Sequence, residues 1–318
     1  MPILVSTTAA PPGPPRPQAP PTTPLAVTYV DPDGTVWPWW DPTSGCVVTS
    51  VTGIGSPPAA YVSTALPGGG ALPQHYGAVP RQIVIGLHVY DDTSQAGLLD
   101  LVDRLARALW HDRPGGPTPG RLIFARPDGS QREIEVFCTS GPEQTDADAT
   151  RNAYQASTDY ALTFESVLDP YFSDVDPVGP LTVAPAPDNA GVPPMPPVLL
   201  ASSTTLGEMS VDVRGNAEAY PIWQITGGGT PTLTNVTTGL SFGLETLQDG
   251  ETITIDTRPG RQSAIDQDGN DRWSDLVKSS PRDLWALAPG TNLLELSIET
   301  PGEGAQISML YHPRWLRA

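Results

Sequence analysis

Basic side chains are scarce in this chain of 318 residues. Lys and Arg together number 17 against 35 Asp and Glu, which gives a formal net charge of −18, and Lys278 is the single lysine. A protein that binds nucleic acid needs cationic side chains to neutralise the phosphates. The charge balance therefore argues against a nucleic-acid-binding protein.

Cysteine and long apolar runs are also scarce. Cys46 and Cys138 are the two cysteines, too few for a metal site of their own, and in a chain of this size buried thiols are favoured over a disulfide. No apolar run reaches the roughly 20 residues that cross a bilayer. The first residues lack the basic start and apolar core of a secretory signal. We therefore expect a protein made in the cytosol that does not insert into a membrane.

Patterns typical of catalysis or cofactor binding are absent from the sequence. No Gly-rich phosphate loop, His-Glu-x-x-His or Gly-x-Ser-x-Gly pattern occurs. Glu133 and Glu135 lie two residues apart on a predicted strand, which places both on its outer face rather than in an acid–base pair. The histidines are dispersed, at His75, His88, His111 and His312. We therefore expect no enzyme, no catalytic residue, no cofactor and no bound metal.

Proline and glycine, in contrast, are abundant, with 38 Pro and 31 Gly, which favours strands joined by turns over long helices. Prolines concentrate in residues 1–24, predicted to be an extended arm that is either unpacked or lies along a neighbouring subunit. They concentrate again in residues 173–198, predicted to be a semi-rigid linker. Because the chain is longer than one core usually organises, we expect two domains, 25–172 and 199–318.

Alternating apolar residues predict strands in the first domain. In the segment 81–90, Ile83, Ile85, Leu87 and Val89 share one face. Hairpins are predicted at 25–37 and 121–137, and a last strand at 152–168. The aromatic cluster at 37–40 is expected to pack in the core or in an interface rather than to bind a ligand.

One amphipathic helix is predicted after residue 90. Asp92 is the expected N-cap, with Gln95 as its capping-box partner, and the helix is expected to stop at 114–116. Its apolar stripe should cover one face of a sheet and consists of Leu98, Leu101, Val102, Leu105 and Leu109.

Short strands separated by turns predict a β-sandwich in the second domain. The strands are expected at 210–213, 222–225, 240–242, 252–255 and 293–298, with turns at 227–229, 249–250 and 268–270. The whole chain is therefore predicted to be mainly β with one α-helix.

The second domain resembles the C-terminal domain of the distal tail proteins of siphophages. The resemblance rests on an ordered series of phrases: GNAEAYP at 215–221, TNVTTG at 234–239, GETITIDT at 250–257, DG at 268–269 and PGTN at 289–292. The first domain, which closes on DPYF at 169–172, resembles the ring-forming domain of that family more weakly. The proline-rich arm and linker depart from the family pattern.

This resemblance implies a β-barrel-like ring domain followed by a galectin-like or jelly-roll β-sandwich. It also implies a structural virion protein at the distal end of the phage tail, forming a homohexameric ring between the tail tube and the tail-tip hub. The implied partners are further copies of the chain, the tail tube protein and the tail-tip hub protein. The tape measure protein and the receptor-binding proteins are further candidates.

If the first domains line the channel of such a ring, some of their acids should face the DNA that passes through it. An acidic wall repels DNA weakly, whereas a basic wall would hold it through many phosphate contacts. The candidate lumen-facing acids are Glu143, Asp146 and Asp148, which lie in a predicted loop between strands. An acidic surface unrelated to a channel is the other interpretation of this charge.

A carbohydrate-binding module that recognises the host envelope is the alternative function. Aromatic side chains of a β-sandwich can stack on sugars. The candidates are Trp223, Trp273, Trp285 and Trp315.

Overall fold

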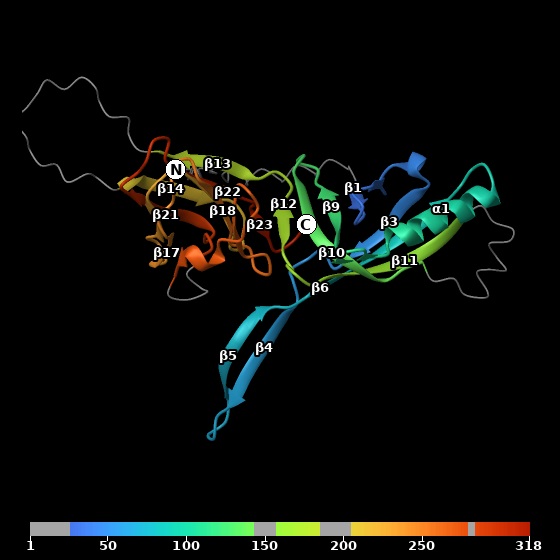
Figure 1. Cartoon of the computed structure of the whole chain (residues 1–318). Helices are drawn as coiled ribbons and strands as arrows, with labels where there is room; N and C mark the ends of the chain where they lie inside the picture. The colour runs from blue at the N-terminus through green and yellow to red at the C-terminus, as the bar shows by residue number, and fades with distance from the viewer. Residues whose placement is uncertain (1–25, 143–156, 185–204, 279–283) are drawn as a thin grey trace, which may run out of the picture.

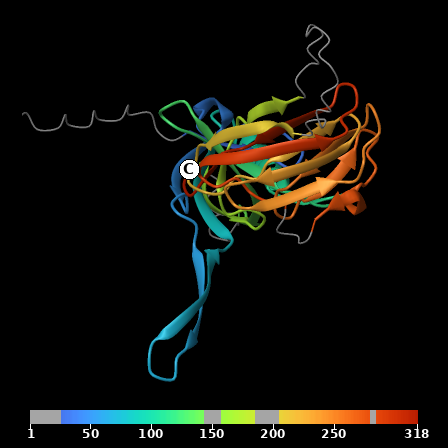
Figure 2. The ribbon, with the colours of Figure 1, turned by 90° about the vertical axis from the view of Figure 1, so that its left-hand side faces the viewer.

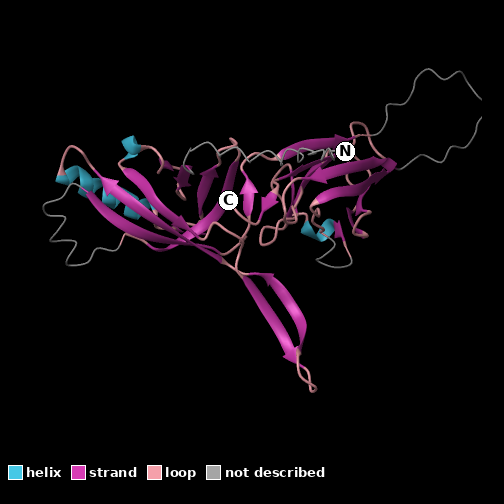
Figure 3. Ribbon diagram, turned by 180° about the vertical axis from the view of Figure 1, so that it is seen from behind, coloured by secondary structure: helices cyan, strands magenta, loops and turns pink. Residues whose placement is uncertain are grey.

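The computed structural model of the protein describes residues 26–142, 157–184, 205–278 and 284–318. The prediction of a mainly β protein is confirmed, since the described strands form antiparallel sheets. In these ranges α1 (Gln95–Ala108) is the one α-helix. Figures 1 and 3 show two β-rich units side by side, with a two-stranded arm projecting from the junction between them.

The first unit is built on a nine-stranded sheet in the order β2-β1-β9-β10-β11-β6-β3, with β12 paired to β10 and β23 paired to β12. Its described strands form an open sheet that does not close into a barrel. The strands are β1 (Ala26–Val30), β2 (Val36–Pro38), β3 (Cys46–Thr52), β6 (Arg81–Tyr90), β9 (Gly120–Ala125), β10 (Gln131–Ser140), β11 (Ser157–Ser166), β12 (Phe172–Asp174) and β23 (Arg314–Trp315).

The alternation of the sequence decides which face of this sheet is buried. Ile83, Ile85, Leu87 and Val89 of β6 are all buried, as predicted. They pack with the apolar stripe of α1. Figure 1 shows this helix lying along the sheet. Trp39 of the predicted aromatic cluster is also fully buried in this core.

The helix boundaries differ from the prediction. Ser94 rather than Asp92 is the N-cap, because its side chain accepts a hydrogen bond from the backbone N–H of Gly97 at 3.0 Å. The helix ends at Ala108, whose carbonyl accepts a hydrogen bond from the hydroxyl of Tyr29. Residues 114–116 lie beyond this end, at a small hairpin of β7 (Asp112–Arg113) and β8 (Gly116–Pro117).

The second unit is a β-sandwich, as predicted, of two five-stranded sheets around one shared core. The first sheet has the order β13 (Val178–Val183), β22 (Gln306–Tyr311), β15 (Ile222–Thr226), β18 (Thr252–Asp256) and β19 (Ser263–Asp266). The second has the order β14 (Thr205–Val213), β21 (Gly290–Glu299), β16 (Thr230–Asn235), β17 (Leu240–Leu244) and β20 (Leu276–Val277).

The chain crosses between the two units twice. Residues 173–174 and 178–183 of the predicted linker lie in β12 and β13, and β13 pairs with β22 of the sandwich. After β22 the chain returns to the first unit, where β23 pairs with β12. There the Trp315 ring lies 3.9 Å from the guanidinium carbon of Arg132. The division into two domains at 173–198 stays a prediction, but the two units are connected by more than a linker.

Candidate functional site

The most prominent surface feature is a hairpin arm made of β4 (Ala59–Ala65) and β5 (Ala71–Ala78). These two strands form a sheet of their own, so no other described strand covers their outer edges. Figure 2 shows the arm extending well away from both units. An isolated hairpin is at best marginally stable in water, and open strand edges are normally protected. The arm therefore has the geometry of a segment that is completed by contact with another molecule.

The composition of the arm agrees with this interpretation. Residues 42–80 contain no Asp, Glu, Lys or Arg, although the chain as a whole is 16% charged. Tyr61 and Tyr76 face each other across the two strands, and Tyr76 is 76% exposed. Exposed large apolar side chains occur along the whole arm, namely Tyr61, Val62, Leu66, Leu72 and Tyr76. An apolar surface of this extent is typical of a protein–protein contact.

Arg81 fixes the base of the arm. Its side chain is almost completely buried and donates hydrogen bonds to the carbonyls of Gly53, Gly55, Pro170 and Leu316. The guanidinium carbon also lies 4.5 Å from the centre of the Phe172 ring. Burial lowers the pKa of Arg81 to about 10, so the group stays charged at neutral pH. One cation thereby joins the entry to the arm, the end of the first unit and the returning C-terminal residues.

Gly53 shows how closely the chain is packed at this base. Its φ of +82° lies in the left-handed region, and a Cβ atom built there would come within 2.1 Å of the carbonyl oxygen of Gln82. Only glycine fits such a backbone without strain. The direction in which the arm leaves the body is therefore set by the local backbone as well as by Arg81.

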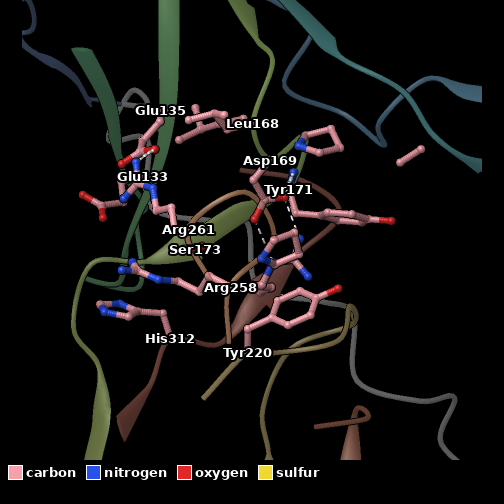
Figure 4. A pocket seen from close by; sticks show the side chains of 15 residues that line it. Glu133, Glu135, Leu168, Asp169, Tyr171, Ser173, Tyr220, Arg258, Arg261 and His312 are labelled. Carbon is pink, nitrogen blue, oxygen red and sulfur yellow. Dashed lines mark hydrogen bonds and ion pairs between the residues drawn. The ribbon is translucent and has the colours of Figure 1, made fainter. Parts of the chain in front are cut away.

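A groove lies beside the arm, between the two units (Figure 4). Its first hollow has a volume of about 300 Å³ and reaches from Ala78 at the arm base to Tyr171 and Tyr220. Figure 4 shows these two tyrosines on one side of the hollow, with Glu135 and Arg261 across from them. Arg261 of the second unit forms an ion pair with Glu135 of the first, which holds the two sides of the groove together.

Arg314 contacts both tyrosines and lines this part of the groove. Its guanidinium carbon lies 4.5 Å from the Tyr171 ring centre and 4.8 Å from that of Tyr220. Two hydrogen bonds, of 2.9 and 2.6 Å, join it to the carboxylate of Asp169. A second hollow of about 290 Å³ adjoins the first and is lined by the same two tyrosines and Arg314, together with Glu218 and Pro289.

The residues singled out in the sequence occupy different places. Glu143, Asp146 and Asp148 lie outside the described residues, so their position relative to a channel stays a prediction. Glu133 pairs with Arg121 at 2.9 Å on the outer face of β10. The part of the chain that the structure covers contains no cluster of metal-ligating side chains and no helix long and apolar enough to cross a membrane.

The tryptophans proposed for sugar stacking do not form a common surface. Trp223 and Trp285 are buried, in edge-to-face contact with ring centres 5.3 Å apart. Trp315 packs against the first unit, and the amine of Lys278 lies 3.5 Å from the ring centre of Trp273. The carbohydrate-binding alternative therefore loses the aromatic platform on which it depended.

Neither the β4–β5 arm nor the groove was predicted from the sequence. The arm has no alternation between apolar and polar residues because both of its faces are exposed. The signal that could have identified it is the absence of charge in 42–80. The groove brings together residues from positions 78 to 314, which no local pattern can predict.

The sequence matches no protein-family model and no curated protein. The structure resembles two chains from the baseplate of phage P2, in its activated conformation with Ca and with Sr, at 9% and 10% identity and a TM-score of 0.48 for each. Each of these similarities covers 90% of this chain and 97% of the other.

The structure is also similar to the Dit protein of phage SPP1, described as a paradigm of the hub adsorption apparatus in phages that infect Gram-positive bacteria. The sequence identity is 13% and the TM-score 0.60, and the match covers 92% of this chain and 99% of the other. The resemblance seen in the sequence is thus confirmed at the level of the fold, because the chain shares the SPP1 Dit fold over nearly its whole length.

Proposed function

We propose that this protein is a distal tail protein, a structural subunit at the tail tip of a siphophage. Six copies form a closed ring between the tail tube and the tail-tip hub, and DNA passes through the ring. Two observations support this role: the fold shared with the SPP1 hub protein and the projecting arm without charge. The role is structural, and we assign no catalytic step to it.

The arm is the observation that carries the proposal of a ring. In a cyclic oligomer each copy presents one surface to the next copy and receives the complementary surface from the copy before. An arm that reaches away from its own body can contact the next copy in this way. Burying Tyr61, Leu72 and Tyr76 there removes apolar surface from water, at about 25 cal/mol for each Å².

Oligomeric state tests the proposal directly. We expect the purified protein to form six-membered rings, visible in negative-stain images and measurable by light scattering. Replacing Tyr61 and Tyr76 together by Ser should leave a folded monomer, because both side chains are exposed and support the contact rather than the core. The matched control is Val277→Ser, since Val277 of the second unit is 58% exposed and Tyr61 is 59% exposed.

Three outcomes would contradict this proposal. Particles that stay monomeric or trimeric at every concentration would exclude the hexamer. Rings that persist in the double variant would show that the arm is not the contact. Rings lost equally in Val277→Ser would show that the effect is not specific to the arm.

The proposed partners are the tail tube protein on one side of the ring and the tail-tip hub protein on the other. The tape measure protein and the receptor-binding proteins are further candidates. Glu143, Asp146 and Asp148 remain the proposed lumen-facing acids. The net charge of −18 supports a wall that DNA passes without being held.

A further inference from the structure

The proline-rich start of the chain has a period of three residues. Residues 11–22 consist of the four triplets PPG, PPR, PQA and PPT, so that proline recurs at Pro11, Pro14, Pro17 and Pro20. A polyproline II helix has three residues per turn and rises 3.1 Å per residue. In that conformation these prolines share one edge and follow one another at about 9 Å. Such a repeat is what proline-recognising grooves bind.

The groove between the two units has the features of such a receptor. Its two adjoining hollows, of about 300 and 290 Å³, share Tyr171, Tyr220 and Arg314 as their common border. Proline-rich segments bind grooves lined by aromatic side chains and need little ordering, because the extended helix is already formed. Two hollows separated by a border of tyrosines can accept successive prolines from one edge of the segment.

The charges of the groove and the segment are complementary. Asp169 is paired with Arg314, and Glu135 with Arg261, so these acids already have cationic partners. Glu218 lines the second hollow, is exposed, and forms no ion pair with any residue that the structure describes. Residues 1–24 contain a single charged side chain, Arg16, within the second triplet. The segment therefore offers one positive charge, at Arg16, and the second hollow one negative charge that is unpaired among the described residues, at Glu218.

The start of β1 lies within reach of the groove. Ala26 pairs with Ala125, which in turn pairs with Gln131 at the beginning of β10. Two strand spacings thus separate Ala26 from Gln131, or about 10 Å. Glu133, two residues further along β10, lines the first hollow. Since extended chain covers up to about 3.3 Å per residue, residues 22–25 are long enough to bridge this distance.

We propose that residues 11–22 bind in the groove between the two units of the same copy, with prolines in the two hollows and Arg16 paired to Glu218. This binding site touches the arm only at its base, at Ala78, and does not depend on the formation of a ring.

Photo-crosslinking in the full-length chain tests this assignment. A photoreactive benzoyl-phenylalanine in place of Gln18 removes no proline from the repeat. After illumination we expect crosslinked peptides that contain Tyr171 or Tyr220, in protein that still migrates as a monomer on a denaturing gel. No crosslink, a crosslink to residues 59–76 of the arm, or a dimer band would overturn the proposal of binding within the same copy.

A charge exchange tests the pairing of Arg16 with Glu218. Glu218→Lys should lower the crosslinking yield roughly two- to fivefold, as expected for an exposed ion pair. Adding Arg16→Glu to that variant should restore the yield. The matched control Glu208→Lys, an exposed acid on β14, should leave the yield unchanged. A loss without restoration, or an equal loss in the control, would exclude the pair.

Discussion

Leu105 is the residue at the centre of the contact between the helix and the first sheet. It is fully buried within the stripe predicted from the sequence. Leu105→Ala should lower the free energy of unfolding by about 2–5 kcal/mol, because it removes apolar contacts and leaves a cavity. Urea unfolding measures this change. The control is Leu99→Ala on the same helix, whose side chain is 48% exposed and which should change stability little.

His111 is held in one neutral form by two hydrogen bonds. Its Nδ1 donates to the carbonyl of Thr118 at 2.9 Å, and its Nε2 accepts from the backbone N–H of Cys138 at 2.8 Å. Burial lowers the pKa of His111 below its ordinary value of 6.5. The unfolded chain therefore binds a proton in a pH range where the folded chain does not.

This difference predicts how stability depends on pH. As the pH falls below 6.5, protonation favours the unfolded state, so stability decreases until the pH reaches the lowered pKa of the folded protein. Above 6.5 His111 contributes no pH dependence. Unfolding free energies measured between pH 5 and 8 should fall more steeply on the acid side in the wild type than in His111→Asn, about 1.4 kcal/mol per pH unit at most. Parallel curves for the two proteins would refute this prediction.

For single residues, the sequence predicted which side chains are buried better than it predicted which residue caps the helix. The alternation in β6 and the stripe of α1 identify their inner faces because burial imposes a regular period. Asp92 and Ser94 both have side chains suited to an N-cap. Which of the two caps the helix depends on where packing against the sheet places the first helical turn. That position is set by tertiary contacts and not by the local sequence. Asp91 already caps the preceding turn by accepting hydrogen bonds from the N–H groups of Thr93 and Ser94.

Among the elements, β23 and the residues that follow it form the least expected contact. Leu316 and Arg317 offer their carbonyls to Arg81 and Arg132, and the N–H of Ala318 donates to the carbonyl of Ile54. These contacts join segments more than 180 positions apart. Pairings over such separations are decided by tertiary packing, so local patterns could predict the strands of the first unit but not this partner.

Removing residues 314–318 should therefore loosen the base of the arm as well as the first unit. We expect faster amide hydrogen exchange in residues 53–58 and 79–82, because Arg81 loses one of its four carbonyl partners and Phe172 loses its strand partner Trp315. Arg317→Ala is the control, since it keeps the backbone carbonyl and removes only an exposed side chain. Unchanged exchange in the truncated protein would contradict the proposed link.

In the predicted linker, 173–198, amino-acid composition was a poor guide to secondary structure. Pro180 lies in β13, which is an edge strand of its sheet and therefore tolerates a residue without an N–H donor. Proline content alone does not distinguish such an edge strand from an extended linker. The arm presents the converse case, because strands exposed on both faces show no period by which they could be identified.

At the scale of the whole molecule, the net charge of each copy opposes the proposed assembly into a ring. Copies that each carry a net charge of −18 repel one another, whereas the arm proposed to join them carries no charged side chain. Raising the NaCl concentration from about 0.02 M to about 0.5 M should therefore favour rings over monomers, because salt screens the repulsion and leaves the apolar contact intact. Light scattering at fixed protein concentration measures this. Rings that dissociate as salt rises would indicate a contact made by ion pairs.

The four backbone carbonyls that bind Arg81 do not become available at the same time during synthesis. A ribosome releases the chain from its N-terminus at roughly 5–20 residues per second. Residue 316 therefore emerges at least several seconds after residue 81, and until then Arg81 lacks the carbonyl of Leu316 as a partner. The base of the arm is therefore completed only after β23 and Leu316 have been made. A nascent chain that has not yet reached residue 316 can hold Arg81 through at most three of its four carbonyl partners.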